Sequence, residues 1–229
     1  MQIVTPGGFL REIPNHPFSR QFQVLEFDDG AISLVPRDCF KKWDSTTPDF
    51  GICYWGRACS LGVGTTIKYD FPQQSLRLGN FIAGGQNLRF MLNGQHQINT
   101  MSTYLIDMPG YELGVRMLPD LVLENDIWIG DETMILGGAR VSNGVVIGAR
   151  SLVVQEQVLE PFGIYAGSPA RLIRHRFDSK IIDLLQQISW WNQPLTWIKA
   201  YGECFRFDLS ADVGKSVELL TELKSNLSN

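Results

Sequence analysis

The sequence predicts an all-β core folded as a left-handed parallel β-helix of hexapeptide repeats, and two observations support this prediction. Over residues 121–154 a branched aliphatic residue recurs every six positions, at Leu123, Ile129, Ile135, Val141, Ile147 and Val153. Small or β-branched residues follow four places after the first five of these, at Ile127, Thr133, Ala139, Val145 and Ser151. A period of six fits neither an amphipathic helix nor an alternating strand, and it is the signature of a β-helix.

The same repeat predicts how each hexad is arranged. Each hexad supplies one short strand and one turn, and three hexads close a triangular coil. The aliphatic residue is expected to point inward and stack on its equivalent one coil away. The small residue is expected at the crowded corner, with Gly, Asn or Asp in the turns, as in Asn125-Asp126 and Asn143-Gly144.

Length and composition indicate one large domain with appendages. The chain has 229 residues, of which 44% are hydrophobic and 19% charged. It has no run of eighteen apolar residues and no basic region before an apolar core at its start, so we expect neither a membrane helix nor a signal peptide. The net charge of −4 and the lack of a Lys/Arg cluster in the repeats predict no nucleic-acid binding.

Cysteine usage points to a reducing compartment. The four cysteines form no CxxC pair: Cys39, Cys53, Cys59 and Cys204. Free thiols and a cytoplasmic location are therefore expected.

Residues 1–50 are interpreted as an N-terminal capping segment. They show no hexad register. Residues 22–27 and 31–35 read as two strands joined by the turn Asp28-Asp29-Gly30, and Pro36 ends the second strand. Because the open end of a coil needs its core covered, this hairpin is expected to cover it.

Residues 51–170 are assigned to the β-helix, with an inserted loop at 93–120. The register starts loosely over 52–67, bulges at 69–75 and returns over 78–90. Gly84 takes an aliphatic position there, so that layer is expected to be underpacked. The period then disappears over 93–120, which predicts an arm that projects from one corner and packs its apolar residues against a neighbouring subunit.

Residues 171–229 are assigned to a C-terminal helical segment. Asp178-Ser179 can cap a helix whose apolar residues run to Ile188, and Trp190-Trp191-Asn192 ends it. A second helix is expected after Pro194 and a weaker third one over 212–223.

Several motifs give the chain a resemblance to a known family. They are Leu78-Gly79-Asn80-Phe81, Phe90-Met91-Leu92-Asn93-Gly94, His96 before Ser102-Thr103-Tyr104, Glu124-Asn125-Asp126-Ile127-Trp128-Ile129-Gly130, Ala166-Gly167-Ser168-Pro169-Ala170-Arg171, and Trp190-Trp191. Together they resemble the xenobiotic acetyltransferases of the hexapeptide-repeat superfamily, the type B chloramphenicol and streptogramin A acetyltransferases. The resemblance covers roughly residues 52–200.

The chain departs from the family pattern at four places, one of which is Asn99, where the family often has Asp. The spacing from Asn93-Gly94 to His96 is one residue shorter than usual. Leu105-Ile106 replaces Pro-Phe in the loop. Val154-Gln155 replaces Thr-Lys, so one contact to the CoA phosphates or adenine is expected to be missing.

His96 is the candidate general base. Transfer of an acetyl group from a thioester to a hydroxyl needs a group that removes the hydroxyl proton, and a neutral histidine suits this. His96 is the only histidine in the coil region, and it lies on the long loop. Its other ring nitrogen needs an acceptor, either a backbone carbonyl or a loop side chain. The alternative is an exposed loop histidine without a role. Since no Cys or Ser has an evident base beside it, we expect direct transfer without an acyl-enzyme.

The resemblance implies acetyl-CoA as co-substrate, held in a groove between the coils of adjacent subunits of a homotrimer. Backbone amides near the small residues Ala139, Ala149 and Ser151 would hold the pantetheine. Trp128 would form part of the wall of this groove. The alternative is an outward-facing aromatic side chain that packs on a neighbour. Arg171 and Arg174 would lie near the CoA phosphates, with the solvated basic face of a helix start as the alternative.

Other functions remain open from the sequence. The resemblance implies that the small-molecule acceptor is a hydroxyl of an antibiotic-like compound. A hydroxyl or amine of a sugar or another metabolite is the alternative. A zinc site of three histidines is disfavoured because His16 and His175 lie outside the coil, so no metal is expected. A non-catalytic β-helix that serves as an assembly scaffold is the remaining alternative.

Overall fold

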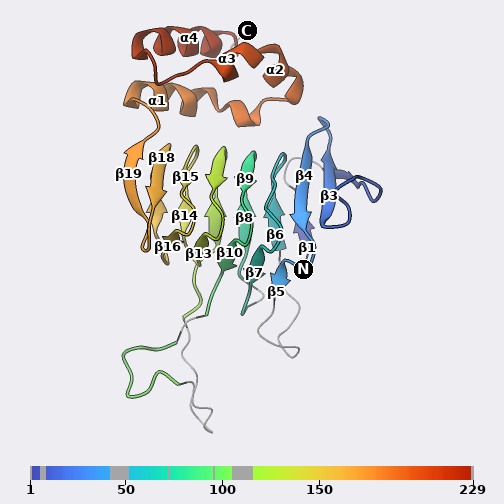
Figure 1. Ribbon diagram of the computed structural model, residues 1–229, viewed down its shortest axis with the longest axis vertical. Coiled ribbons are helices and arrows are strands. Elements are labelled where there is room, and N and C mark those ends of the chain that lie inside the picture. The colour runs from blue at the N-terminus through green and yellow to red at the C-terminus, as the bar shows by residue number, and fades with distance from the viewer. Residues whose placement is uncertain are drawn as a thin grey trace.

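Three parallel sheets form the three faces of a coil (Figure 1). The computed structural model describes residues 2–5, 9–41, 52–71, 73–94, 96–104 and 116–227. Successive short strands fall in different sheets, and each pairs in parallel with a strand one coil before and one coil after it. The chain therefore folds as the predicted left-handed parallel β-helix.

The strands of each sheet are as follows. The first sheet contains β1 (Gln2–Val4), β6 (Ile52–Trp55), β8 (Leu76–Leu78), β11 (Leu121–Leu123), β14 (Arg140–Val141) and β17 (Val158–Leu159). The second sheet contains β5 (Phe40–Lys41), β7 (Thr66–Lys68), β10 (Arg89–Met91), β13 (Met134–Leu136) and β16 (Leu152–Val153). The third sheet contains β9 (Ile82–Gly84), β12 (Ile127–Ile129), β15 (Val146–Ile147), β18 (Gly163–Ala166) and β19 (Arg171–His175).

The hexad residues form the core of the coil, as predicted. Every aliphatic residue of the six-residue series is at most 1% exposed: Leu123, Ile129, Ile135, Val141, Ile147 and Val153. The small or β-branched series is at most 2% exposed: Ile127, Thr133, Ala139, Val145 and Ser151. Equivalent residues stack along the coil axis, since Ile135 pairs with Phe90 on one side and with Val153 on the other.

Asparagine side chains connect successive coils at one corner. Asn125 Oδ1 accepts from the backbone N–H of Asn80 at 2.7 Å, 45 residues earlier. Asn143 Oδ1 accepts in the same way from the backbone N–H of Asn125 at 3.1 Å, over only 18 residues. Eighteen residues is therefore one regular coil, and the coil between Asn80 and Asn125 carries 27 residues more.

The N-terminal hairpin lies at one end of the coil (Figure 1). The strands β2 (Phe9–Glu12), β3 (Phe22–Phe27) and β4 (Ile32–Pro36) pair antiparallel. Leu25, Phe27 and Val35 join the same buried cluster as the coil residues. β1, which the hexad pattern does not predict, adds a strand beside β6. Residues 42–51 lie outside the described residues.

The C-terminal segment starts with a strand and continues as helices that lie along one side of the coil (Figure 1). β19 pairs antiparallel with β18, so the alternative interpretation of Arg171 and Arg174, as the basic face of a helix start, is wrong. The helices are α1 (Ser179–Ile188), a 3-10 turn (Trp190–Asn192), α2 (Leu195–Ala200), α3 (Gly202–Arg206) and α4 (Val213–Ser225). Asp178 caps α1 as predicted, because its carboxylate accepts from the N–H of Lys180 at 2.9 Å.

Arg57 ties the helices to the hairpin and the coil. Its guanidinium pairs with Asp29 in the hairpin turn and donates to the carbonyl oxygen of Trp191 at 2.9 Å and to that of Gln193. It also lies 5.3 Å from the ring centroid of Phe81. The Arg57 side chain is only 10% exposed, so these partners replace the water it loses.

The layer at Gly84 is filled, so the expected underpacking is wrong. A Cβ atom at Gly84 would lie 2.6 Å from Cδ2 of Leu61 and 2.9 Å from Cδ1 of Leu88. These two leucines, which are at most 1% exposed, occupy the space that a larger residue would take. In the part of the chain that the structure describes, no helix has the length and apolarity needed to cross a membrane.

Candidate active site

The described residues of the inserted loop project from the coil as an arm (Figure 1). It leaves after β10 and returns at β11, where the second sheet gives way to the first. Figure 1 shows it on the side of the coil opposite the C-terminal helices. Residues 93–94, 96–104 and 116–120 of the arm are described, whereas Leu105-Ile106 lie outside the described residues.

A buried amide pair closes the base of the arm. Gln74 Nε2 donates to the Leu92 carbonyl oxygen at 2.9 Å and to Asn93 Oδ1 at 3.3 Å. Asn93 Oδ1 also accepts from the N–H of Leu118 at 3.4 Å. The outgoing chain at residue 93 and the returning chain at residue 118 are therefore joined through Gln74, which comes from the bulge at 69–75. The sequence analysis missed this clamp because a glutamine in a bulge carries no pattern.

His96 is exposed on the arm with one ring nitrogen fixed. Its Nδ1 lies 2.8 Å from the carbonyl oxygen of Thr103. Because a carbonyl oxygen only accepts, Nδ1 carries the hydrogen, and Nε2 of the neutral ring is left as the acceptor. This partner is one of the two kinds that the sequence analysis expected, a backbone carbonyl.

The segment around Thr103 is held by its own short-range hydrogen bonds. Thr100 Oγ1 donates to the carbonyl oxygen of Ser102 at 2.7 Å. The N–H of Tyr104 donates to Ser102 Oγ at 3.0 Å. These bonds fold the Ser-Thr-Tyr motif into a turn, and the turn brings the Thr103 carbonyl to the histidine.

Three of the residues predicted to bind the co-substrate lie on the third sheet. Trp128 is on β12 with 60% of its side chain exposed. Arg171 and Arg174 are exposed on β19, which is separated from β12 by β15 and β18. Arg174 Nη1 donates to the carbonyl oxygen of its neighbour His175 at 3.0 Å. Their contacts to a ligand stay predictions.

The three small residues predicted to line the groove lie at two corners. Ala149 is exposed after β15, whereas the side chains of Ala139 and Ser151 are buried and face inward. Ser151 Oγ donates to the carbonyl oxygen of Gly148 at 2.6 Å. Only the backbone of Ala139 and Ser151 is left to meet a ligand, which is the role predicted for them and remains a prediction.

Ala139 lies close to the base of the arm. It shares a corner with Gly137, where an added Cβ atom would lie 2.0 Å from the carbonyl oxygen of Leu92. The corner at 137–139 is therefore stacked directly on the clamp that closes the arm. Among the described residues, no three His, Cys, Asp or Glu side chains are grouped as a metal ion would require.

The known proteins that are similar in sequence to this chain are acetyltransferases named for antibiotics. No family model matches the chain. It is 35% identical over 133 residues to a probable macrolide acetyltransferase of Lysinibacillus sphaericus, which covers 54% of this chain and 73% of that protein. It is 37% identical over 145 residues to a chloramphenicol acetyltransferase of Agrobacterium fabrum, covering 58% and 68%. Identity to the virginiamycin A acetyltransferase of Staphylococcus aureus is 29% over 151 residues, covering 63% and 68%.

Solved structures give a weaker likeness. A mutant of AntD, an N-acyltransferase from Bacillus cereus in complex with dTDP and coenzyme A, superposes with a TM-score of 0.45 at 17% identity, over 69% of this chain and 88% of that one.

Proposed function

The chain belongs to the xenobiotic acetyltransferases of the hexapeptide-repeat superfamily, and from this premise we propose that it acetylates a hydroxyl of a small antibiotic-like molecule. It is an acetyltransferase that uses acetyl-CoA as the acetyl donor. The names of its relatives cover chloramphenicol, macrolides and virginiamycin A. The acceptor class is therefore taken from the relatives.

The observation that carries the proposal is the contact between His96 Nδ1 and the Thr103 carbonyl. With Nδ1–H fixed, Nε2 takes the proton of the acceptor hydroxyl as its oxygen forms a bond to the acetyl carbonyl carbon. The carbon–sulfur bond then breaks, and the proton passes from Nε2 to the leaving thiolate sulfur. The Thr103 carbonyl stabilises the imidazolium that exists between these transfers. Such a base contributes on the order of a hundred- to ten-thousandfold in rate.

The exposed apolar residues of a single chain support a homotrimer. On the arm, Ile98 is 87% exposed, Met101 106% and Tyr104 77%. On the coil, Trp128 is 60% exposed. We propose that the arm packs on a neighbouring coil, so that His96 of one chain meets the co-substrate residues of the next. With four free cysteines, the trimer is expected to act in the cytoplasm.

One feature favours a second acceptor class. Leu105-Ile106 replaces the family's Pro-Phe in the sequence, which changes side chains that the resemblance assigns to the active-site loop. A sugar or metabolite hydroxyl or amine is therefore the second candidate.

The test is the thiol released from acetyl-CoA by wild type and by His96→Ala. The acceptors are chloramphenicol, a streptogramin A, a macrolide and several amino sugars. We expect kcat to fall a hundred- to ten-thousandfold in His96→Ala, with acetyl-CoA affinity by calorimetry unchanged. His16→Ala, on the N-terminal hairpin, is the control and keeps wild-type turnover. Unchanged turnover in His96→Ala would exclude His96 as the base, and absence of acetyl-CoA binding by wild type would favour a scaffold.

A further inference from the structure

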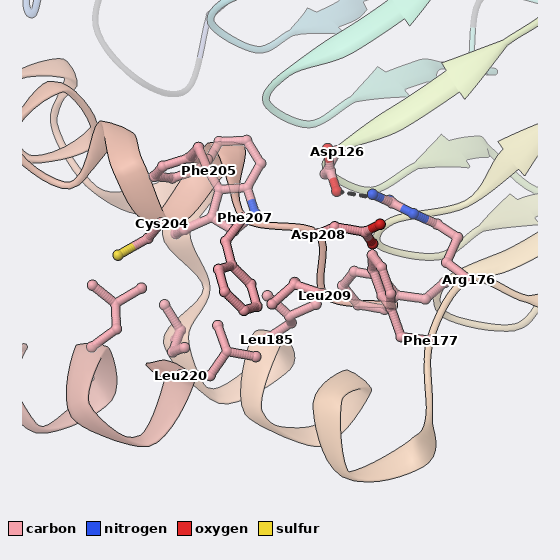
Figure 2. A pocket seen from close by; sticks show the side chains of 14 residues that line it. Asp126, Arg176, Phe177, Leu185, Cys204, Phe205, Phe207, Asp208, Leu209 and Leu220 are labelled. Carbon is pink, nitrogen blue, oxygen red and sulfur yellow. Dashed lines mark hydrogen bonds and ion pairs between the residues drawn. The ribbon is translucent and has the colours of Figure 1, made fainter. Parts of the chain in front are cut away.

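A pocket lies between the C-terminal helices and the coil, with a volume of about 420 Å³ (Figure 2). Its apolar lining includes Leu185 and Ile188 of α1 and Leu220 of α4, with Phe162 of the coil. These side chains are buried. The volume falls within the range of drug-sized ligand sites, about 300–1,000 Å³.

Aromatic rings form much of the pocket wall. Phe162 and Phe177 lie with their ring centroids 6.1 Å apart, and Trp190 meets Phe205 edge to face at 5.0 Å. At the mouth, Phe205 is 42% exposed and Phe207 40% exposed. Partly exposed aromatic faces at a pocket mouth favour a flat apolar group or an organic cation.

The single cation in the lining is already neutralised. Arg176 Nη1 donates to Asp126 Oδ2 at 3.0 Å and to the carbonyl oxygen of Gly144 at 2.9 Å. Its guanidinium carbon also lies 4.9 Å from the ring centroid of Phe177. An anionic ligand would have to compete with Asp126 for this guanidinium. Figure 2 shows this ion pair at one end of the pocket.

The second carboxylate of the lining is Asp208, which forms no ion pair within the part of the chain that the structure describes. Asp208 lies on the exposed segment after α3, and its Oδ1 accepts from the N–H of Ser210 at 2.9 Å and from Ser210 Oγ at 2.6 Å. Hydrogen bonds from the side chain and backbone of Ser210 lower the pKa of Asp208, so the group is ionised at neutral pH. The lining therefore holds two carboxylates and one guanidinium.

We propose that this pocket binds a small molecule that joins an aromatic or other apolar body to a positively charged amine. The body packs between the buried leucines and the rings of Phe205 and Phe207, and the amine lies at Asp208. The proposal goes beyond the acetyl transfer, because within one chain the helices and the arm lie on opposite sides of the coil (Figure 1).

The probes are three naphthalenes that differ in charge, each titrated by calorimetry into the native oligomer. They are (2-naphthylmethyl)trimethylammonium, neutral 2-naphthalenemethanol and the anion 2-naphthylacetate. We expect the cation to bind about tenfold more tightly than the neutral compound, the size of a partly desolvated cation–π and ion-pair contact. We expect the anion to bind more weakly than either.

Two variants assign the binding to this pocket. Asp208→Asn keeps an oxygen that accepts from Ser210, and it is expected to abolish the preference for the cation. Phe207→Ala, at a 40% exposed position, is expected to weaken all three probes. Glu218→Gln removes one carboxylate from the exposed face of α4 outside the pocket lining and should leave binding unchanged.

Cys204 provides a readout that is independent of affinity. It is partly exposed and lines the pocket, so the cation should slow its alkylation by iodoacetamide in wild type. The same protection is expected in Glu218→Gln and not in Phe207→Ala.

Three results would overturn the proposal. One is no binding of the cation at millimolar concentration, and another is equal binding of all three probes. The third is a cation affinity that neither Asp208→Asn nor Phe207→Ala changes, because the binding would then lie elsewhere.

Discussion

Three cysteines lie inside the coil, and burial changes their acid–base chemistry. Burial raises the pKa of the Cys39 and Cys59 thiols to about 12. It raises the pKa of Cys53 as well. The thiolate is the reactive form of cysteine, so these three groups are inert at neutral pH in the folded protein.

A thiol titration checks this. In native protein at pH 8, Ellman's reagent is expected to react with Cys204 alone, because it is the one cysteine that is not buried. In concentrated guanidinium chloride, all four cysteines should react, since unfolding removes the burial that raises the pKa values. Cys204→Ser is the control and should show no fast thiol. Fast reaction of more than one thiol in the native wild type would contradict the buried core.

At the residue scale, the sequence predicts the identity of the candidate base better than its surroundings. A single histidine in an interrupted repeat singles out His96. Its partner depends on how the Ser102–Tyr104 turn closes, and that is decided by hydrogen bonds of three chemically ordinary residues. Nothing in their composition distinguishes a carbonyl partner from a side-chain partner.

The clamp at the base of the arm predicts that Gln74 controls activity from outside the reacting groups. Gln74→Ala leaves the Leu92 carbonyl oxygen without its side-chain donor and removes one of the two donors to Asn93 Oδ1, which costs about 1–3 kcal/mol at a buried site. We expect kcat to fall about tenfold and the arm to be cut faster by trypsin at Arg116. Gln73→Ala, at the exposed neighbouring position, is the matched control. Wild-type turnover and cleavage in Gln74→Ala would show that the clamp is dispensable.

Arg57 has a different effect, on the attachment of the helices. Arg57→Met leaves the Asp29 carboxylate without its cation and removes one of the two donors to the Trp191 carbonyl, and breaking a buried ion pair costs about 3–5 kcal/mol. Urea unfolding should show this loss, and hydrogen exchange should be faster in the helices than in the coil. Arg37→Met, whose pair with Glu12 is 3.5 Å long and 46% exposed on the arginine side, should change stability by less than about 1 kcal/mol. Similar losses in both variants would contradict a special role for Arg57.

At the element scale, local patterns predict well and distant contacts do not. The hexads and the Asp178 cap can each be predicted from residues that are close together in the sequence, and both are found in the structure. The contact from Gln74 to Leu118 spans 44 residues, and the contact from Arg57 to Trp191 spans 134. Such pairs leave no periodic trace. β19 was missed for a related reason, because its four exposed residues lack strand alternation.

At the scale of the whole molecule, the arm is expected to hold the trimer together. Ile98→Glu combined with Met101→Glu places two charges on residues that are 87% and 106% exposed in a single chain. Light scattering should show a trimer for wild type and the 25.8 kDa monomer for the double variant, with an unchanged circular dichroism spectrum. Val213→Glu, on α4, is the control and should remain trimeric. A monomeric wild type would refute the proposed assembly.

The coil was predictable at this scale because every hexad repeats the same pattern of one inward aliphatic residue and one small or β-branched residue. The side on which the helices pack was not, since it depends on Arg57 and Asn80 meeting the Trp191 carbonyl. The pocket between the helices and the coil could not be predicted from the sequence either, because it also depends on contacts between distant residues. Its lining comes from segments between residues 126 and 223 that become neighbours only after the chain turns back.

The 27 extra residues of the arm sit in a coil whose strands still pair in normal register, β8 with β11. Closing a longer loop costs only about 0.6 kcal/mol for each doubling of its length. Insertions and deletions within the arm are therefore expected to leave the layers on either side undisturbed. Changes in the length or sequence of this one segment can therefore alter the acceptor that the enzyme takes, while the fold of the coil stays the same.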